Sequence, residues 1–217
     1  MRDRRRTAVA PCRIEAVLPR RDAELVQIVD AALRDATVRA TRPDGSSWLA
    51  CRPGCTPCCH GVFRISALDA ERLQAGLVEL DAASPQRAAA VRSRAARLAA
   101  ELSAGFPGDA ATGRLDPEAE AWDDFADLPA ADAPCPALDP STGRCELYTS
   151  RPMTCRVFGP PVRNEGGIGI CELCYVGAGE AEVLHGEMAC DHTALEAELD
   201  STLPPGETVI AWALLRP

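Results

Sequence analysis

The sequence contains no lysine, because all 23 basic residues among its 217 are arginine. This absence excludes Schiff-base chemistry on a lysine amine and the phosphate-binding lysine of a P-loop. Aromatic residues make up only 4% of the chain, which disfavours a stacking platform for nucleic-acid bases. The formal net charge of −9 also argues against non-specific nucleic-acid binding, so we expect no nucleic-acid partner.

Long apolar runs are missing as well. Residues 1–6 have the positive start of a signal peptide, but Pro11, Arg13 and Glu15 interrupt the segment that follows. No stretch is apolar over the length that spans a bilayer, so we expect no membrane partner. These features predict a cytoplasmic protein, and in that compartment clustered thiols more often hold metal than form disulfides.

Cysteine, by contrast, is abundant, with 11 residues. Four of them, Cys51, Cys55, Cys58 and Cys59, lie in one short stretch whose prolines and glycine favour turns over a continuous helix. Looping backbone with closely spaced thiols is how proteins hold a soft metal ion or an iron–sulfur cluster. Buried structural cysteines are the alternative, but the density of thiols favours a zinc or iron–sulfur centre over that alternative.

A second cysteine-rich region begins at Cys135. A tight turn expected at residues 139–143 would bring Cys135 and Cys145 together. Pro152 suits the first position of a short helix that carries Cys155 near its start, where the helix dipole favours a thiolate. We therefore expect these three thiols to be metal ligands together with the first four, in one site or in two.

Two arginines flank Cys155 in the sequence. A divalent ion held by four thiolates keeps about two net negative charges, and Arg151 and Arg156 could offset them. Ordinary surface pairing of both arginines is the alternative.

Further ligands are expected near the end of the chain. A Cys-x2-Cys pair could complete the main centre, or could form a separate zinc site of three cysteines and one histidine. The residues concerned are Cys171, Cys174, His185 and Cys190. The side chains of adjacent Cys58 and Cys59 should diverge, so these two thiols are expected either to serve two sites or to include one bystander.

The remaining sequence predicts a small, single, mainly α-helical and loop-rich domain with few short strands, stapled by cysteine-ligated metal. Apolar periodicity predicts helices over residues 22–40 and 84–103, the latter with a solvated arginine face, and Ser66 should cap another helix. The expected organisation is a flexible basic arm, a metal-binding domain with a mobile acidic insert, and a tail that packs on the domain. Their bounds are 1–20, 21–203 with the insert at 109–134, and 204–217.

The cysteine pattern resembles the YkgJ-type cysteine-cluster family, the zinc- or iron-chelating domain with a CxxxCxxCC signature. The matching pattern is Cys51-x3-Cys55-x2-Cys58-Cys59, then Cys135-Pro136, then Cys145-x2-Tyr148-x2-Arg151-Pro152-x2-Cys155-Arg156-x-Phe158. The resemblance implies metal ligation by the matching cysteines, with Tyr148 and the two arginines beside the metal. Some members are described as iron–sulfur oxidoreductases, and relatives include flagellin lysine N-methylases.

We therefore expect a metal-binding protein with a structural or electron-transfer role. The alternative is an enzyme, either an iron–sulfur oxidoreductase or a methyl-transfer protein. Nine cysteines are the expected ligands: Cys51, Cys55, Cys58, Cys59, Cys135, Cys145, Cys155, Cys171 and Cys174. No catalytic residue can be assigned, because no Ser/His/Asp or Cys/His pairing indicates hydrolysis.

Overall fold

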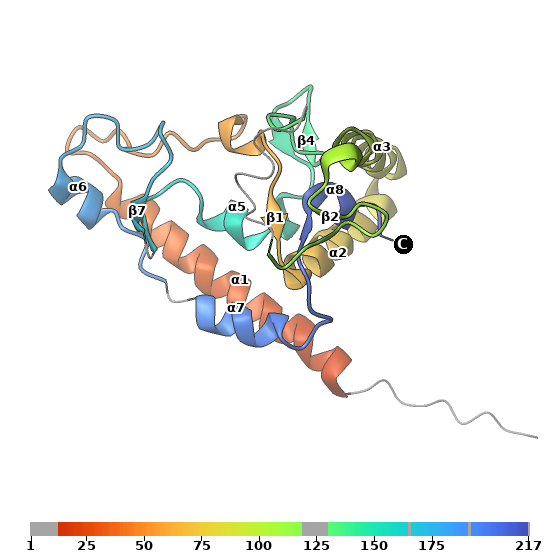
Figure 1. Cartoon of the computed structure of the whole chain (residues 1–217). Helices are drawn as coiled ribbons and strands as arrows, with labels where there is room; N and C mark the ends of the chain where they lie inside the picture. The colour runs from red at the N-terminus through yellow and green to blue at the C-terminus, as the bar shows by residue number, and fades with distance from the viewer. Residues whose placement is uncertain (1–12, 119–129, 165, 191, 217) are drawn as a thin grey trace, which may run out of the picture.

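The computed structural model describes residues 13–118, 130–164, 166–190 and 192–216 (Figure 1). The described chain is mostly helical, as the sequence predicts. The helices are α1 (Arg13–Arg39), α2 (Ala67–Ala83), α3 (Pro85–Leu102), α5 (Met153–Val157), α6 (Glu180–His185), α7 (Thr193–Asp200) and α8 (Ile210–Ala213). Three 3-10 turns accompany them: η1 (Pro57–Cys59), η2 (Ser103–Gly105) and η3 (Tyr148–Ser150).

The strands form four separate antiparallel pairs of two or three residues each. They are β1 (Arg64–Ile65) with β8 (Thr208–Val209), β2 (Gly108–Asp109) with β3 (Arg114–Leu115), β4 (Leu138–Asp139) with β5 (Arg144–Cys145), and β6 (Val162–Asn164) with β7 (Gly167–Gly169). Such short pairs hold loops in place rather than form a layer of their own. The expectation of a loop-rich fold with few short strands is confirmed.

The start signals of α2 and α3 act as the sequence predicts. The Ser66 hydroxyl accepts a hydrogen bond from the backbone N–H of Asp69 at 3.2 Å, which satisfies one orphan donor of α2. Helix α3 begins at Pro85, whose missing N–H costs nothing in the first turn. The two helices pack against each other along Leu73, Leu77 and Val91.

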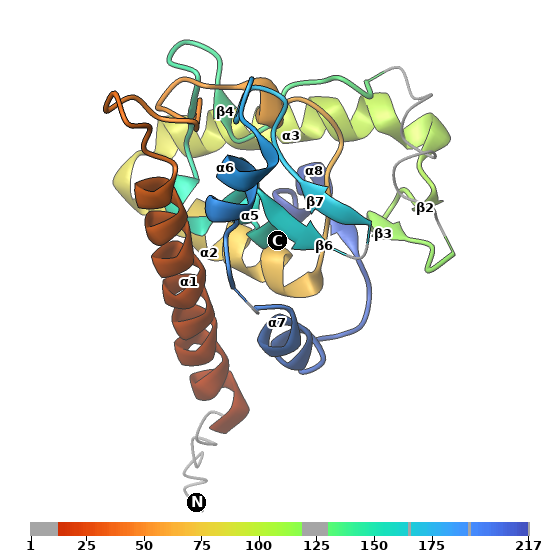
Figure 2. The same ribbon diagram turned by 90° about the vertical axis from the view of Figure 1, so that its left-hand side faces the viewer.

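Helix α1 begins earlier than expected. It starts at Arg13 rather than near Asp22, so residues 13–20, which we expected in a flexible arm, are helical. Only residues 1–12 of that arm remain, and they lie outside the described residues. Helix α1 runs along one side of the molecule, with α7 packed beside it (Figure 1, Figure 2).

The C-terminal residues form the centre of the core. Helix α8 is buried between the two main apolar clusters, where Trp212 contacts Phe106 with ring centroids 4.3 Å apart. Strand β8 pairs with β1, and the Thr208 hydroxyl donates to the Gly113 carbonyl at 2.7 Å. The predicted tail thus packs on the domain, and its burial shows that it is also part of the domain's core.

The acidic insert is anchored at both ends. Its first residues form the β2–β3 hairpin, and the Trp212 indole N–H donates to the Ala110 carbonyl at 2.8 Å. Its last residues pair with the cysteine stretch, because the Gly61 N–H donates to the Ala133 carbonyl at 2.9 Å. Both ends of residues 109–134 are therefore tied to the rest of the domain, and residues 119–129 lie outside the described residues. No described helix is long and apolar enough to cross a membrane.

Candidate metal centre

The thiols gather into two sets drawn from distant parts of the chain. Thiols that lie close enough to shift one another's pKa values belong to the same set. The Cys51 set consists of Cys51, Cys55, Cys171 and Cys174. The Cys135 set consists of Cys58, Cys59, Cys135, Cys145 and Cys155. Cys12 lies outside the described residues.

The Cys51 set is built from two tight turns. In the first, the Cys55 N–H donates to the Arg52 carbonyl at 2.9 Å, and Gly54 supplies the positive φ of 88° that this turn needs. In the second, the Cys174 N–H donates to the Cys171 carbonyl at 2.8 Å. The turns face each other, because the sulfur atoms of Cys51 and Cys174 are 3.9 Å apart.

Backbone groups surround the sulfur atoms of this set. The Ala50 N–H donates to the Cys174 sulfur at 3.4 Å. Gly159, at φ 131°, lies so close to Cys51 that a Cβ atom there would stand 2.8 Å from the sulfur. The Cys171 N–H in turn donates to the Gly159 carbonyl at 3.3 Å. Only glycine combines this φ with this close approach, so the chain is shaped to receive the Cys51 sulfur.

Aromatic residues cover the other side of the Cys51 set. Trp48 stacks on Tyr175 with ring centroids 6.0 Å apart, and the Arg42 guanidinium lies 3.5 Å above the Trp48 ring centre. Trp48, Leu49 and Tyr175 belong to the apolar cluster that contains Cys171 and Cys174. This cluster screens the Cys171 and Cys174 thiols from water, which favours metal–thiolate bonds over hydration, whereas Cys51 is exposed.

Strand pairing brings the Cys135 set together. The Cys135 N–H donates to the Cys59 carbonyl at 2.7 Å, so the cysteine stretch runs beside the segment that enters β4. In the hairpin, Leu138 pairs with Cys145, which confirms the turn expected over residues 139–143. The Gly143 N–H donates to the Asp139 carbonyl at 2.9 Å and closes that turn. Helix α5 adds Cys155, whose charge interacts with that of Cys145.

Cys58 and Cys59 share one set despite being neighbours. They lie in the 3-10 turn η1, whose tight winding differs from both an ideal strand and an ideal α-helix, and their thiols hydrogen-bond each other. Cys59 also faces Cys135, Cys145 and Cys155. The division between the two sets thus falls between Cys55 and Cys58, whereas the sequence argument looked for it between Cys58 and Cys59.

Several of the buried or crowded thiols resist ionisation, because their pKa values are raised. Burial, followed by the nearby thiols, raises the pKa of Cys51 to about 12, and burial raises that of Cys135 and of Cys155 to about 12 as well. The hydrogen bond with Cys59 and burial raise the pKa of Cys58, and the same hydrogen bond lowers the pKa of Cys59. Crowded thiols cannot all become anions unless a cation lies between them, and a thiophilic metal supplies that charge.

Arg151 faces the Cys135 set. Burial raises the pKa of Cys145 and of Cys155, and the Arg151 guanidinium opposes this rise at both thiols. The guanidinium also lies 4.1 Å from the centre of the Tyr148 ring. Its Nε is buried and has no hydrogen-bond partner among the described residues. This orphaned donor stands where a thiolate centre would place negative charge.

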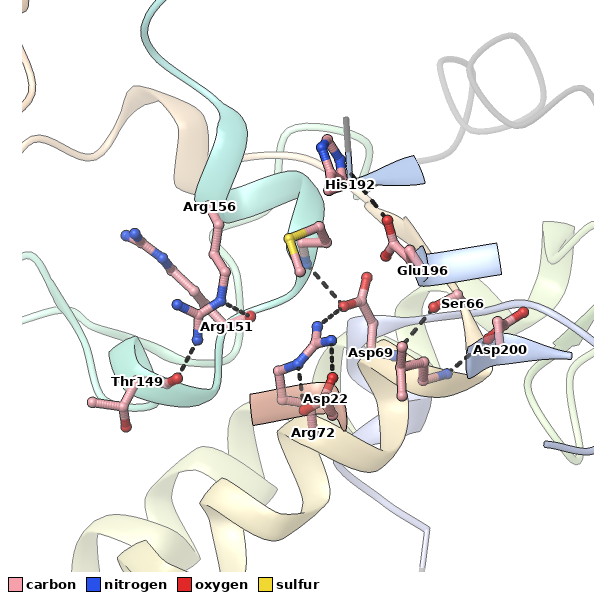
Figure 3. Close-up of polar contacts among 12 residues, drawn as sticks. Asp22, Ser66, Asp69, Arg72, Thr149, Arg151, Arg156, His192, Glu196 and Asp200 are labelled. Atoms are coloured by element: carbon pink, nitrogen blue, oxygen red, sulfur yellow. Dashed lines mark hydrogen bonds and ion pairs between the residues drawn. The ribbon is translucent and has the colours of Figure 1, made fainter. Parts of the chain in front are cut away.

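Arg156 has a different role from Arg151. Its guanidinium donates to the Arg151 carbonyl at 3.2 Å and to the Thr149 carbonyl (Figure 3). It also donates to Asp30 on α1 at 3.1 Å. These contacts fix the loop before α5 against α1. Arg156 therefore acts on Cys155 by holding the short helix in place.

A buried carboxylate holds the other end of α5. Asp69 accepts a hydrogen bond from the Met153 N–H at 2.8 Å and pairs with Arg72. Arg72 also binds Asp22 on α1 at 2.5 Å, so a single arginine joins α2 to the long helix (Figure 3). Asp69 was expected only as a first-turn residue of the helix that Ser66 caps, and the buried pairing of Asp69 and Asp22 with Arg72 was not predicted.

The hairpin that carries Cys135 and Cys145 is clamped by α3. The Glu146 side chain is only 6% exposed and pairs with Arg94 and with Arg87, the latter at 2.9 Å. Arg94 also donates to the Pro136 carbonyl at 2.8 Å. The expectation that the α3 arginines form a solvated face is therefore wrong for Arg94, whereas Arg87 is 57% exposed and reaches Glu146 from that face. The sequence carried one signal of this clamp. Glu146 directly follows Cys145, and a glutamate that is buried together with such a neighbour needs a basic partner.

His185 and Cys190 lie apart from both sets. His185 is exposed at the end of α6, and its carbonyl accepts a hydrogen bond from Arg39 at 2.8 Å. Cys190 packs against the apolar cluster between α1 and α7, with Leu25 and Leu199. The structure thus pairs Cys171 and Cys174 with the first cysteine turn, and does not bring His185 or Cys190 to them.

The two sets fit a thiophilic metal by donor type, by the Gly159 cradle and by the orphaned Nε of Arg151. In the described parts of the chain, no three ligand-type side chains already stand in the arrangement of a closed metal site. Binding would therefore require the sulfur atoms to turn about their Cα–Cβ bonds toward a common point. When bound, the metal supplies the positive charge that stabilises the thiolates.

The fold and the site define a helical, loop-rich protein with a cysteine cluster. A family model matches residues 50–174, more than half of the chain, with the description "CxxCxxCC: Putative zinc- or iron-chelating domain". The chain belongs to this family, and the resemblance found in the sequence is confirmed. Neither a curated protein nor a solved structure matches the chain.

Proposed function

We propose that this protein holds zinc or an iron–sulfur cluster through its clustered cysteines, in a structural or electron-transfer role. The observation that carries this proposal is the convergence of nine thiols from five separate segments into two sets, one of which faces the buried, unpaired Nε of Arg151. Crowding destabilises the thiolate form of these groups, and a shared cation offsets that repulsion. The family description supports chelation of zinc or iron and leaves the role open.

The burial of the thiols supports both roles. A structural centre needs ligands shielded from water, and Cys171 and Cys174 are 8% and 5% exposed. An electron-transfer centre needs a cluster near the surface, and Cys58 is exposed. The identity of the metal therefore decides between the two roles.

The test is metal analysis and visible spectroscopy on the full chain purified without oxygen. Bound zinc in a colourless protein would support a structural centre. Iron with acid-labile sulfide in a brown protein, bleached reversibly by a reductant, would support electron transfer or an oxidoreductase. A folded protein that contains neither metal, and that binds neither added Zn²⁺ nor reconstituted iron and sulfide, would overturn the proposal.

We also infer a reducing compartment such as the cytoplasm. The sulfur atoms of Cys51 and Cys174 are 3.9 Å apart, and the proposed metal binding requires both thiols to stay reduced. In an oxidising compartment such crowded thiols would be prone to form disulfides. Alkylation of rapidly quenched cells followed by mass spectrometry should find thiols or metal-protected thiols, and a majority of disulfides would contradict the inference.

A further inference from the structure

The spatial grouping of the sulfur atoms carries a more specific conclusion, which rests on the proposed metal binding. We propose that the chain holds two separate metal centres. The Cys51 set closes around a single tetrahedral ion of the zinc type, and the Cys135 set forms the second centre. The division runs through the CxxxCxxCC signature, between Cys55 and Cys58.

The geometry of the Cys51 set matches one tetrahedral ion. Zinc–thiolate bonds of about 2.3 Å in a tetrahedron place neighbouring sulfur atoms about 3.8 Å apart. The Cys51 and Cys174 sulfurs are 3.9 Å apart. The set is also made of a Cys-x3-Cys turn and a Cys-x2-Cys turn, and both spacings lie within the range of structural zinc sites.

The surroundings of the Cys51 set suit a closed site. The Ala50 N–H donates to the Cys174 sulfur, as backbone amides do to metal-bound thiolates, and Gly159 leaves room for the Cys51 sulfur alone. An aromatic cover lies over the remaining side. With four thiols present, the ion needs no further ligand, which is the composition of a structural site rather than a catalytic one.

The Cys135 set differs from the Cys51 set in its number of thiols and in the charged side chain that faces it. It contains five thiols, one more than a mononuclear site or a four-ligand cluster uses. Arg151 faces it, whereas two arginines near the Cys51 set contact other groups: Arg42 lies over the Trp48 ring, and Arg52 donates to the Ala50 carbonyl at 3.2 Å. A centre with a bridging thiolate or a larger, more negative cluster would use both the extra thiol and the arginine.

The two centres also connect different elements of the fold. The Cys51 set joins the loop after α1 to the loop before α6, at the end of the molecule where α6 and β7 lie (Figure 1, Figure 2). The Cys135 set joins η1, the β4–β5 hairpin and α5, and two of its thiols pack against the main core. Loss of one centre should therefore leave the helices and loops that hold the other centre folded.

The test compares three single variants of the full chain: Cys174→Ser, Cys145→Ser and Cys190→Ser. Metal per protein is counted by elemental analysis and by native mass spectrometry on anaerobically prepared samples. Wild type should carry two centres. Cys174→Ser should lose only the Cys51-set metal and Cys145→Ser only the other, while the matched control Cys190→Ser, outside both sets, should keep both.

The outcomes are distinguishable. A wild type without metal would overturn the proposed function itself. A wild type with one centre, or variants that both lose the same metal, would overturn the division into two centres, as would metal loss in Cys190→Ser. If a serine variant fails to fold, Gly159→Ala replaces Cys174→Ser and Arg151→Gln replaces Cys145→Ser, because each perturbs one set without removing a thiol. Each of these variants should weaken metal binding at its own set only, measured by competition with a chromophoric chelator, and weakening at both sets by one variant overturns the proposal.

Discussion

The Cys51 set and the Cys135 set are supported by different parts of the molecule. The Cys51 set lies between loops, and its local apolar cluster consists of small segments around Trp48 and Tyr175. The Cys135 set rests on the main core, because Cys135 and Cys145 pack against Leu73 and its neighbours on α2 and α3. In one region the metal would organise loops, and in the other an existing core organises the ligands.

This difference shows how one domain can use thiols in two ways. Where helices already bury apolar area, ligands are positioned by ion pairs such as Glu146 with Arg94. Where few apolar residues are available, glycine cradles and backbone N–H groups position the sulfur atoms instead. The loops of the Cys51 set should therefore depend more on bound metal than the helices do.

Removal of metal should have the largest effect, and the effect should be uneven. Binding of a structural thiolate-bound zinc ion contributes roughly 10 kcal/mol or more to folding. We expect an anaerobic chelator to increase hydrogen exchange most in residues 48–55 and 170–175, and to leave α2 and α3 protected, because they have their own core. Hydrogen-exchange mass spectrometry before and after chelation measures this. Uniform loss of protection would show that the two regions fold as one unit.

The Glu146→Ala substitution should lower the stability of the protein and weaken the Cys135 set without affecting the Cys51 set. It leaves Arg94 without its buried partner and should cost about 3 kcal/mol of unfolding free energy, measured by denaturant titration. Metal at the Cys135 set should fall, and metal at the Cys51 set should remain. The control is Glu187→Ala, which breaks the largely exposed pair with Arg163 and should cost less than about 1 kcal/mol. Equal costs for the two variants would mean that the clamp on the hairpin is unimportant.

The Gly159→Ala substitution should act on the Cys51 set. A non-glycine residue at φ 131° costs on the order of 1–3 kcal/mol, and the new methyl group would also press on the Cys51 sulfur. Gly167→Ala is a matched control, because its φ is 124° and nothing lies within 4 Å of the added carbon. Both variants should lose similar backbone stability in thermal unfolding. Only Gly159→Ala should lower the metal content of the Cys51 set; identical metal contents would refute the cradle.

The smallest effect is expected from Arg151→Gln. Loss of the positive charge beside Cys145 and Cys155 should weaken metal binding at the Cys135 set by about 1 kcal/mol, or roughly fivefold, in competition with a chromophoric chelator. Arg144→Gln, an exposed arginine on the same hairpin, provides the control and should have no effect. A loss of the same size at the Cys51 set would show that the arginine acts on the whole protein rather than on its neighbouring thiols.

Local chemistry explains which parts of the fold could be predicted. Ser66 and Pro85 mark the starts of α2 and α3 because caps act over a few residues. The start of α1 was missed because Pro19 lies inside the helix, and a proline within a helical pattern normally marks a helix boundary. The role of Arg87 and Arg94 was missed for a different reason: an arginine on a helix surface reveals nothing about a carboxylate some 50 residues away.

The sequence by itself determined the chemistry of the site: clustered thiols, soft-metal donors and membership of a chelating family, because residue type and spacing carry that information. Only the tertiary structure decided which thiols lie together. Loop closure brought Cys51 to Cys174, which lies 123 residues away in the chain. Strand pairing placed Cys59 beside Cys135. Such contacts depend on how the helices pack and where the chain returns, and these are properties of the whole core rather than of any short segment.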